Sequence, residues 1–187
     1  MTTTTEPGTG LARRLAEDLD GAFPELVRAF QDGLYSGVQR LVPAAEAEDV
    51  TQEAFVRAYR AMQGYDPARV AALRLPGWLW TIALNLCRNR ARAAGRRPRQ
   101  VVLDHDHRDP SPGPEDAALA ASASRAWDRR LAALGPEQRR AVVLRHIAGL
   151  GYDEIAEVTG RAVGTVKSDV HRGLARLEAM LDKEDNR

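Results

Sequence analysis

A group of polar side chains near the carboxyl end of the chain has the types and spacing that bind nucleic acid. Its members are Thr165, Lys167, Ser168, His171 and Arg172, which recur at helical intervals. Cations of this kind neutralise phosphates, and hydroxyl groups and histidine can reach base edges. The set therefore indicates a DNA-binding helix. An ordinary helical hairpin with a solvated face has the same spacing and stays open at this point.

The segments around this face form a helix-turn-helix pattern. A short helix is expected over 152–158, Gly160 can adopt the positive φ of a tight turn, and a second helix follows. The second helix has apolar residues three or four apart, which places them on one buried face. These residues are Val163, Val166, Val170, Leu174, Leu177 and Leu181. The polar face is thus held against a core by its opposite side.

A second basic cluster lies between positions 76 and 99. Pro76 begins a predicted helix whose polar side carries Thr81, Asn85, Arg88, Asn89 and Arg92. The interval contains arginines at 88, 90, 92, 96, 97 and 99 and no acidic residue. Such a one-sign run predicts phosphate contacts. The alternative is a solvated helix end whose arginines interact with the negative end of the helix dipole.

The stretch 44–61 predicts a helix with two distinct faces. Val50, Ala54, Phe55, Ala58 and Met62 form an apolar stripe. Polar residues gather off the stripe, at Asp49, Gln52, Glu53, Arg57 and Arg60. This polar face is either solvated surface or a contact for a partner protein.

The whole chain predicts an all-α fold of two small helical domains joined by a flexible linker, the second domain ending in the helix-turn-helix. The first domain is expected over 11–92, with a strong helix beginning at Pro24 and a loop over 64–75, and the second over 115–187. Residues 1–10 are expected to be a disordered tail. The linker, 93–114, contains three prolines and a glycine in five residues and could span roughly 70–75 Å when extended.

Composition limits the classes of function. The net charge is only +1, so affinity for nucleic acid must come from local clusters. Cys87 is expected to be a buried small hydrophobe, and His105 and His107 in the linker have no further histidine or cysteine nearby to complete a metal site. We therefore expect no metal, no cofactor and no catalytic residues. The absence of an apolar amino-terminal segment or an apolar run of about 20 residues predicts a cytoplasmic protein without membrane insertion.

Five segments occur in a characteristic order: DVTQEAFVRAY at 49–59, PGWLWTIALN at 76–85, LGPEQRRAVVLRHIAGL at 134–150, YDEIAE at 152–157 and VGTVKS at 163–168. Together they closely resemble the extracytoplasmic-function (group IV) sigma factors of bacterial RNA polymerase. The resemblance covers 22–92 and 115–181. It implies a promoter-recognition subunit that binds the polymerase core at the β′ clamp and the β flap, contacts promoter DNA, has an anti-sigma partner and has no catalytic activity of its own.

The resemblance also implies a role for each polar face. Core polymerase would be bound by Asp49, Gln52, Glu53 and Arg57. The −10 element would be melted and read by the loop 65–75 and the helix after it, through Tyr65, Asn85, Arg88, Asn89 and Arg92. In the −35 element, Lys167 and Arg172 would hold phosphates, and Arg161, Thr165, Ser168 and His171 would lie near base edges. Trp78 and Trp80 could stack on bases, although Trp78 lies on the apolar stripe and is expected in the core.

Two residues depart from the family pattern. Asn89 stands where an aspartate is frequent, and Asp169 stands where a basic residue is usual. We expect Asp169 to project toward solvent or DNA. There it either pairs with Arg172 or Lys167 or accepts a hydrogen bond from a cytosine amino group. A stand-alone helix-turn-helix regulator is the alternative function, but it would not need the polar face of 44–61 or the helix that begins at Pro76.

Overall fold

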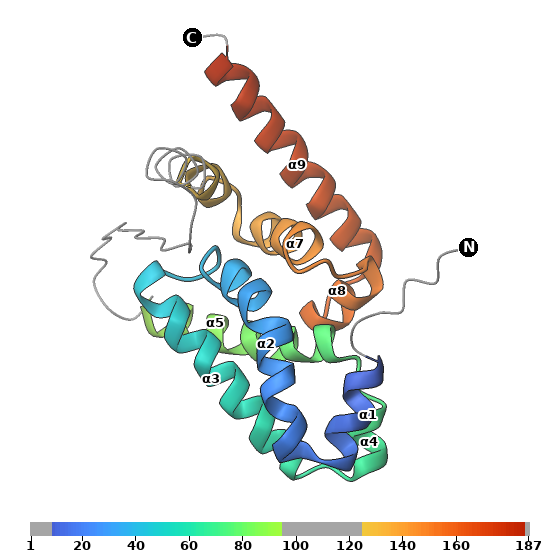
Figure 1. Ribbon diagram of the computed structural model, residues 1–187. Coiled ribbons are helices and arrows are strands. Elements are labelled where there is room, and N and C mark those ends of the chain that lie inside the picture. Colours follow the sequence, from blue (N-terminus) through green and yellow to red (C-terminus); the bar gives the residue numbers. More distant parts are fainter. Residues whose placement is uncertain (1–8, 95–124, 186–187) are drawn as a thin grey trace.

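The computed structural model describes residues 9–94 and 125–185, and every regular element in these ranges is an α-helix (Figure 1). The first group of helices comprises α1 (Thr9–Glu17), α2 (Leu19–Val38), α3 (Ala44–Gln63), α4 (Pro67–Ala71) and α5 (Leu75–Ala94). The second comprises a helical segment over 125–132, α7 (Pro136–His146), α8 (Tyr152–Thr159) and α9 (Val163–Asp185). The predicted all-α fold ending in a helix-turn-helix is confirmed.

The first group is built on α2, α3 and α5, with α1 packed against α4 and α2. Helix α2 begins five residues earlier than the predicted start at Pro24, because Asp18 caps it by accepting a hydrogen bond from the backbone N–H of Gly21 at 2.9 Å. Pro24 lies inside the helix. Helix α2 ends at Val38, and Leu41 and Val42 lie in the following turn.

Other boundaries also differ from the expectation. Helix α1 begins at Thr9, inside the predicted tail, and residues 1–8 lie outside the described ranges. The predicted loop over 64–75 contains α4, which Asp66 caps by accepting from the N–H of Arg69 at 2.9 Å. Helix α5 continues to Ala94, and the rest of the predicted linker, with His105 and His107, lies outside the described ranges.

The second group is held together by the packing of α7 against α9. Gly173 is buried at this crossing, where a side-chain Cβ would lie 2.7 Å from the Val142 Cγ2 atom. Only a glycine therefore allows the two helices to approach this closely. Leu174, which the periodicity predicted as a core residue, is 39% exposed. The face of α9 that meets α7 is centred on Gly173, not on its apolar neighbour.

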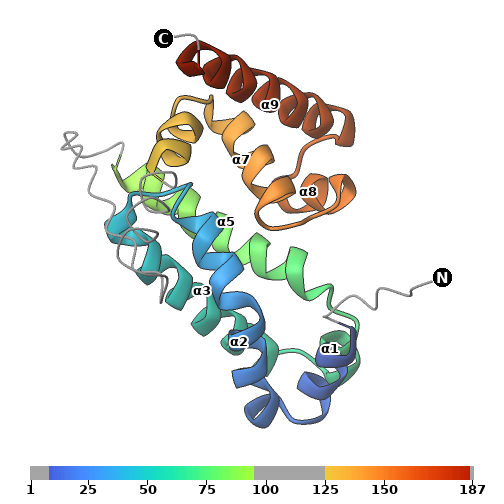
Figure 2. The same cartoon turned by 45° about the horizontal axis from the view of Figure 1, so that its top comes forward.

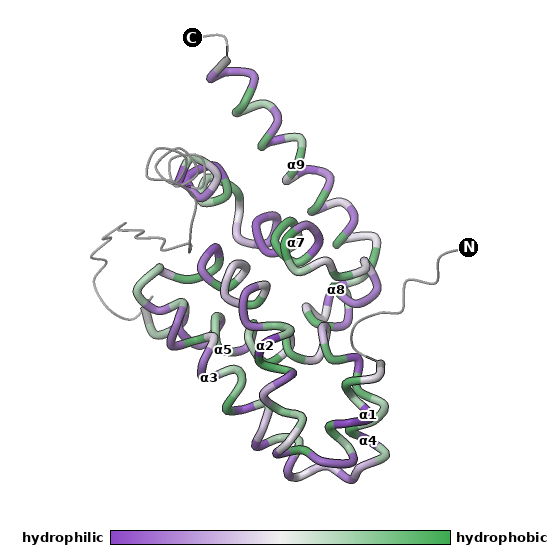
Figure 3. Tube along the Cα trace, viewed as in Figure 1, coloured by the Kyte–Doolittle hydropathy of each residue, from purple (hydrophilic) through white to green (hydrophobic). Residues whose placement is uncertain are grey.

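The two groups pack against each other, chiefly through α5 and α8 (Figures 1 and 2). Val143, Leu144 and Ile155 of the second group belong to the same buried cluster as the first group's core. Beside this interface, the Trp80 ring of α5 lies directly over Gly37 of α2, where an added Cβ would be 2.4 Å from a ring carbon and 3.4 Å from the Val143 Cγ1 atom of α7. Figure 3 shows hydrophilic and hydrophobic positions alternating along the helices, as expected when each helix buries one side.

Polar contacts reinforce this interface. Arg74, before α5, forms an ion pair of 3.1 Å with Glu154 of α8, and Arg40 forms one of 3.3 Å with Asp128. No helix in the described ranges is both long and apolar enough to cross a membrane.

Candidate nucleic-acid and partner interfaces

The helix-turn-helix consists of α8, a glycine turn and α9. Gly160 has a φ of 70°, as predicted, and its N–H donates to the Ala156 carbonyl at 2.8 Å, which ends α8. At the other end of α8, the Glu154 carboxylate accepts from the backbone N–H of Gly151 at 2.8 Å. The motif is therefore fixed locally at both ends of its first helix.

The predicted DNA-binding face of α9 is exposed. All five of its residues are exposed: Thr165, Lys167, Ser168, His171 and Arg172. The Ser168 hydroxyl donates back to the Gly164 carbonyl at 2.9 Å, and the Lys167 ammonium lies 5.6 Å from the centre of the Tyr152 ring. These contacts leave the outer surface of the helix open to a ligand. Arg161, in the turn before α9, is half-buried.

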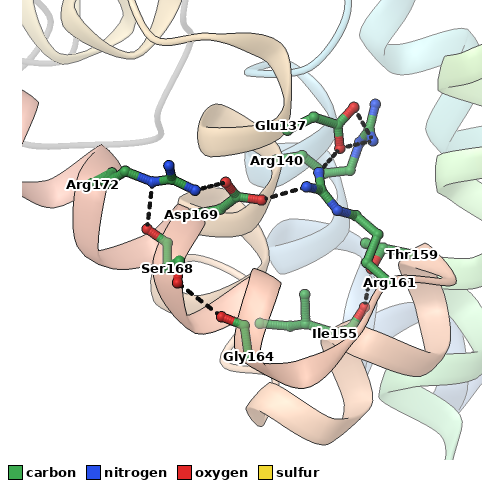
Figure 4. Close-up of polar contacts among 9 residues, drawn as sticks. All are labelled: Glu137, Arg140, Ile155, Thr159, Arg161, Gly164, Ser168, Asp169 and Arg172. Atoms are coloured by element: carbon green, nitrogen blue, oxygen red, sulfur yellow. Dashed lines mark hydrogen bonds and ion pairs between the residues drawn. The ribbon is translucent and has the colours of Figure 1, made fainter.

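Asp169 does not project toward solvent or DNA as expected: it is only 6% exposed. Its carboxylate lies 3.3 Å from the Arg172 guanidinium, the pairing proposed from the sequence, and also 2.8 Å from Arg161 (Figure 4). Arg161 in turn pairs with Glu137 of α7, which also pairs with Arg140 at 2.8 Å. The Arg161 contact draws Asp169 inward, and helical periodicity could not reveal it because position 161 lies before the helix.

This chain of alternating charges links three elements of the second group. Figure 4 shows the Arg161 guanidinium lying between the Asp169 and Glu137 carboxylates, one from α9 and one from α7. The Arg161 and Asp169 side chains are 29% and 8% exposed, so solvent screens their interaction only partly. The turn that orients the recognition helix is therefore attached to both long helices of this group.

The predicted −10 face lies on α5, close to α8. Asn85, Asn89 and Arg92 are exposed. Arg88 is half-buried, and its guanidinium donates to the Thr159 carbonyl at 3.3 Å and to the Asn85 side chain at 3.4 Å. Part of the predicted −10 face is thus in contact with the end of α8 in this arrangement.

The arginines that follow Pro76 do not all have the same surroundings. Arg90 lies 3.9 Å from Glu46 and 3.6 Å from Glu53, both on α3. It therefore joins α5 to α3. Arg96, Arg97 and Arg99 lie outside the described residues.

The aromatic residues near the predicted −10 loop differ in how deeply they are buried. Trp80 is 4% exposed and occupies the interface between the two groups, so it cannot stack on a base in this structure. Trp78 is half-buried, with its ring 6.3 Å from that of Tyr65. The Arg69 guanidinium lies 3.7 Å from the centre of the Tyr65 ring. Trp78 was expected in the core, but Trp80 is the more deeply buried of the two.

The polar face of α3 presents a compact surface away from the apolar stripe. Asp49, Gln52 and Arg57 are exposed, and Glu53 is half-buried. Glu53 accepts from the Arg57 guanidinium at 2.6 Å as well as facing Arg90. Val56 lies within this face and is 48% exposed, which sequence reasoning missed. Val56 thus adds an exposed apolar group to this polar face.

Cys87 is buried, as predicted, and burial raises the pKa of its thiol to about 11. The thiol is thus kept protonated near neutral pH. Within the described ranges no three histidine, cysteine or carboxylate side chains come together in a way that could hold a metal ion.

Comparison with known proteins identifies both helical groups. The family model described as Sigma-70 region 2 matches residues 26–97, and that of Sigma-70, region 4 matches residues 124–177. A relative from Mycolicibacterium smegmatis, "ECF RNA polymerase sigma factor SigE", is 37% identical over 172 residues, covering 88% of this chain and 63% of that relative. "ECF RNA polymerase sigma-E factor" of Escherichia coli is 34% identical over 179 residues, covering 90% of this chain and 91% of that relative.

Two solved structures share the arrangement of helices. CnrH in complex with the cytosolic domain of CnrY superimposes with a TM-score of 0.68 at 27% identity, covering 94% of this chain and 97% of that one. The sigma factor RpoE in complex with the anti-sigma factor NepR from Bartonella quintana gives a TM-score of 0.67 at 24% identity, covering 86% and 96%. The second likeness bears on the fold alone.

Proposed function

This chain belongs to the extracytoplasmic-function (ECF) sigma factors of the sigma-70 family, and we infer that it acts as an RNA polymerase sigma factor. It binds the core enzyme and directs promoter recognition and transcription initiation. The observation that carries this conclusion is the presence of regions 2 and 4 in order on one chain. A stand-alone helix-turn-helix regulator has no use for region 2, so that alternative is not favoured.

We assign core binding to the α3 face defined by Asp49, Gln52, Glu53 and Arg57, with Val56 added. Charged and amide groups around an apolar centre suit a polar, specific contact with the β′ clamp. Glu53 is held by Arg57 and Arg90, so its carboxylate is positioned before any partner arrives. The β flap contact is assigned to region 4 as a whole.

Promoter reading is divided between α5 and α9. On α5, Asn85 and Asn89 can hydrogen-bond to exposed bases of the −10 strand, and Arg88 and Arg92 can neutralise its phosphates. Tyr65 lies at the edge of this face under Arg69. On α9, Lys167 and Arg172 face phosphates of the −35 element, and Thr165, Ser168 and His171 reach the major groove. Arg161 is assigned to the same site through its place in the turn.

The two DNA-binding faces must separate when the promoter is bound. The −10 and −35 elements lie about 25 base pairs apart, or roughly 85 Å along B-form DNA at 3.4 Å per step. In the structure, by contrast, Arg88 of the −10 face touches Thr159 of the helix-turn-helix. We therefore propose that regions 2 and 4 move apart on the polymerase.

The remaining properties follow from the family. The chain initiates transcription through the catalytic chemistry of the polymerase and has no catalytic residues of its own. It works in the cytoplasm, with the polymerase. An anti-sigma factor is the proposed regulatory partner, and the solved structure of CnrH, which has a similar fold, supports a protein partner because it is a complex with the cytosolic domain of CnrY.

Affinity for purified core polymerase tests the α3 assignment. We expect Gln52→Ala combined with Glu53→Ala to weaken binding about tenfold, roughly 1.4 kcal/mol, with unchanged helix content. Gln31→Ala with Asp32→Ala alters two exposed residues of α2 and serves as the matched control. If the α3 pair changes affinity by less than about twofold, its face is only solvated surface. If the unaltered chain does not bind core at all, the sigma-factor assignment itself is wrong.

A further inference from the structure

Helix α1 buries its apolar side against the rest of region 2. Leu11, Ala12 and Leu15 are each no more than 2% exposed and belong to the main hydrophobic cluster. Leu15 follows the other two by four and three positions, so all three share one face of the helix. The helix packs mainly on α4, and Figure 1 shows the two side by side at one end of region 2. Helix α1 precedes the segment that matches the region 2 family model, which begins at residue 26.

Helix α4 is too short to be stable by itself. It has five residues, and isolated helices of fewer than about 12–15 residues are marginal in water because the first turn is costly to form. Asp66 caps it, but Val70 is its one buried residue. Its structure therefore depends on packing, and its principal neighbour among the described helices is α1.

Helix α4 sets the surroundings of Tyr65, which belongs to the face assigned to the −10 strand. The Arg69 backbone N–H donates to Asp66 at 2.9 Å, and the Arg69 guanidinium lies 3.7 Å from the centre of the Tyr65 ring. The Tyr65 ring lies edge-on to that of Trp78, with 6.3 Å between the ring centres. Unwinding or moving α4 would carry the Arg69 guanidinium away from the Tyr65 ring and change the surface that this loop presents to DNA.

An ion pair joins α1 to α2. The Arg14 guanidinium lies 2.5 Å from the Glu25 carboxylate, but both side chains are about half exposed, at 51% and 46%. Exposed ion pairs contribute little, so most of the attachment of α1 comes from burial of its leucines. A substitution at Leu15 should therefore loosen α1 more than one at Arg14.

We propose that α1 is a positioning element for −10 reading: it holds α4, and thereby Tyr65 and Arg69, in the arrangement that meets the melted strand. The proposal rests on the sigma-factor assignment. Taking a base out of the stack costs free energy, which the protein recovers only if its aromatic and cationic groups are already in place. Core binding is assigned to α3, a different helix, so loosening α1 should leave it unchanged.

Hydrogen exchange of the full chain tests whether α1 holds α4. The amide N–H groups of Val70, Ala72 and Leu73 donate to carbonyls within this segment, each at 3.1 Å, so their exchange reports its opening. We expect Leu15→Ala to speed their exchange about tenfold or more. The matched control is Leu34→Ala, because Leu34 is also buried, at 3% exposed, but lies near the carboxyl end of α2. Exchange that rises equally in both variants, or in neither, would overturn the proposal.

Promoter opening by the holoenzyme tests whether this packing serves −10 reading. The probe is the permanganate reactivity of thymines in the melted segment, on a promoter fragment found by run-off transcription. We expect Leu15→Ala to lower this reactivity about fivefold or more while core affinity changes by less than about twofold. Leu15→Met, which refills the space, should restore both slow exchange and opening. Loss of core affinity in parallel with opening would mark general unfolding of region 2 and would also refute the positioning role.

Milder variants are available if Leu15→Ala does not fold by circular dichroism. Leu15→Val and Leu34→Val are then compared in the same two assays, with smaller effects in the same direction expected for Leu15→Val alone. Faster exchange in α4 without loss of opening refutes the −10 role of α1 and leaves the sigma-factor assignment intact. If the unaltered chain opens no promoter with core polymerase, the sigma-factor assignment fails, and the exchange assay still decides whether α1 holds α4.

Discussion

Replacing Asp169 by alanine should destabilise region 4 without altering which bases α9 prefers. The Asp169 side chain is 8% exposed, and its carboxylate faces the guanidinium groups of Arg161 and Arg172. Its removal leaves Arg161 half-buried with Glu137 as its remaining partner. The turn before α9 then loses one of its two attachments. Base preference should be unchanged because the carboxylate faces two arginines.

The expected magnitude comes from the exposure of each pair. The bond to Arg161 is charge-assisted and mostly shielded from water, and such bonds contribute about 1.5–3 kcal/mol. The pair with Arg172 lies on a side chain that is 62% exposed, and exposed pairs three residues apart contribute about 0.2–0.5 kcal/mol. Because Arg161 keeps Glu137, we expect a loss near the middle of this range, about 2 kcal/mol. For a chain of this length that lowers the Tm by about 4–8 °C.

Thermal unfolding followed by circular dichroism measures the first effect, with Asp182→Ala, an exposed acid on the same helix, as the matched control. A double-mutant cycle with Arg161→Ala isolates the pair. Binding of the polymerase holoenzyme to single-base variants of its −35 element measures the second effect. The structural role of Asp169 is refuted if Asp169→Ala shifts stability by no more than the control does. It is also refuted if discrimination falls by about 1–3 kcal/mol at one base pair alone, since that marks a direct base contact.

Gly173→Ala should destabilise the chain by about 1–3 kcal/mol in a denaturant titration, because the added Cβ would meet Val142. Gly164 lies in open space, so Gly164→Ala should be neutral or slightly stabilising. Equal effects of the two substitutions would refute the close packing at Gly173. Cys87, with its pKa raised from 9.0 to about 11, should react with iodoacetamide at pH 8 about a hundredfold more slowly in folded than in unfolded chain. The same shift should reduce stability as pH rises from 9 toward 11, where only the unfolded thiol ionises, and Cys87→Ala should remove this slope. The free chain should bind duplex DNA weakly and with strong salt dependence; nanomolar binding that salt does not weaken would favour a stand-alone regulator.

The fold was predictable from the sequence wherever a pattern is local. Apolar spacing, Pro136 and Gly160 located α7, the turn and α8 to within a residue or two, because helix starts and glycine turns depend on near neighbours. The start of α2 was missed because Pro24 is a stronger signal than the aspartate that caps the helix at Asp18. In region 4, periodicity could not show that α7 would approach α9 at Gly173 and leave Leu174 exposed.

The sequence predicted which helix faces carry the candidate sites, but it did not predict the ion-pair networks within them. The exposed positions on α3, α5 and α9 follow from helical periodicity, so most of the predicted contact residues lie on the surface. The burial of Asp169 depends on Arg161 and, through it, on Glu137, which is 32 positions away in sequence. Arg90 was expected to meet phosphates because its acidic partners, Glu46 and Glu53, lie on another helix. Such pairings form only when the helices pack together, so the spacing of residues along the sequence does not predict them.

Run-off transcription with purified core polymerase tests most directly whether this chain acts as a sigma factor. Genomic fragments serve as templates, and transcription is compared with and without the chain. A sigma factor predicts discrete transcripts that appear only when both the core enzyme and this chain are present. It also predicts their loss on mutation of either the −10 or the −35 element upstream of the start site. If the chain binds its DNA targets yet gives no transcript with core polymerase, its role in transcription initiation is contradicted.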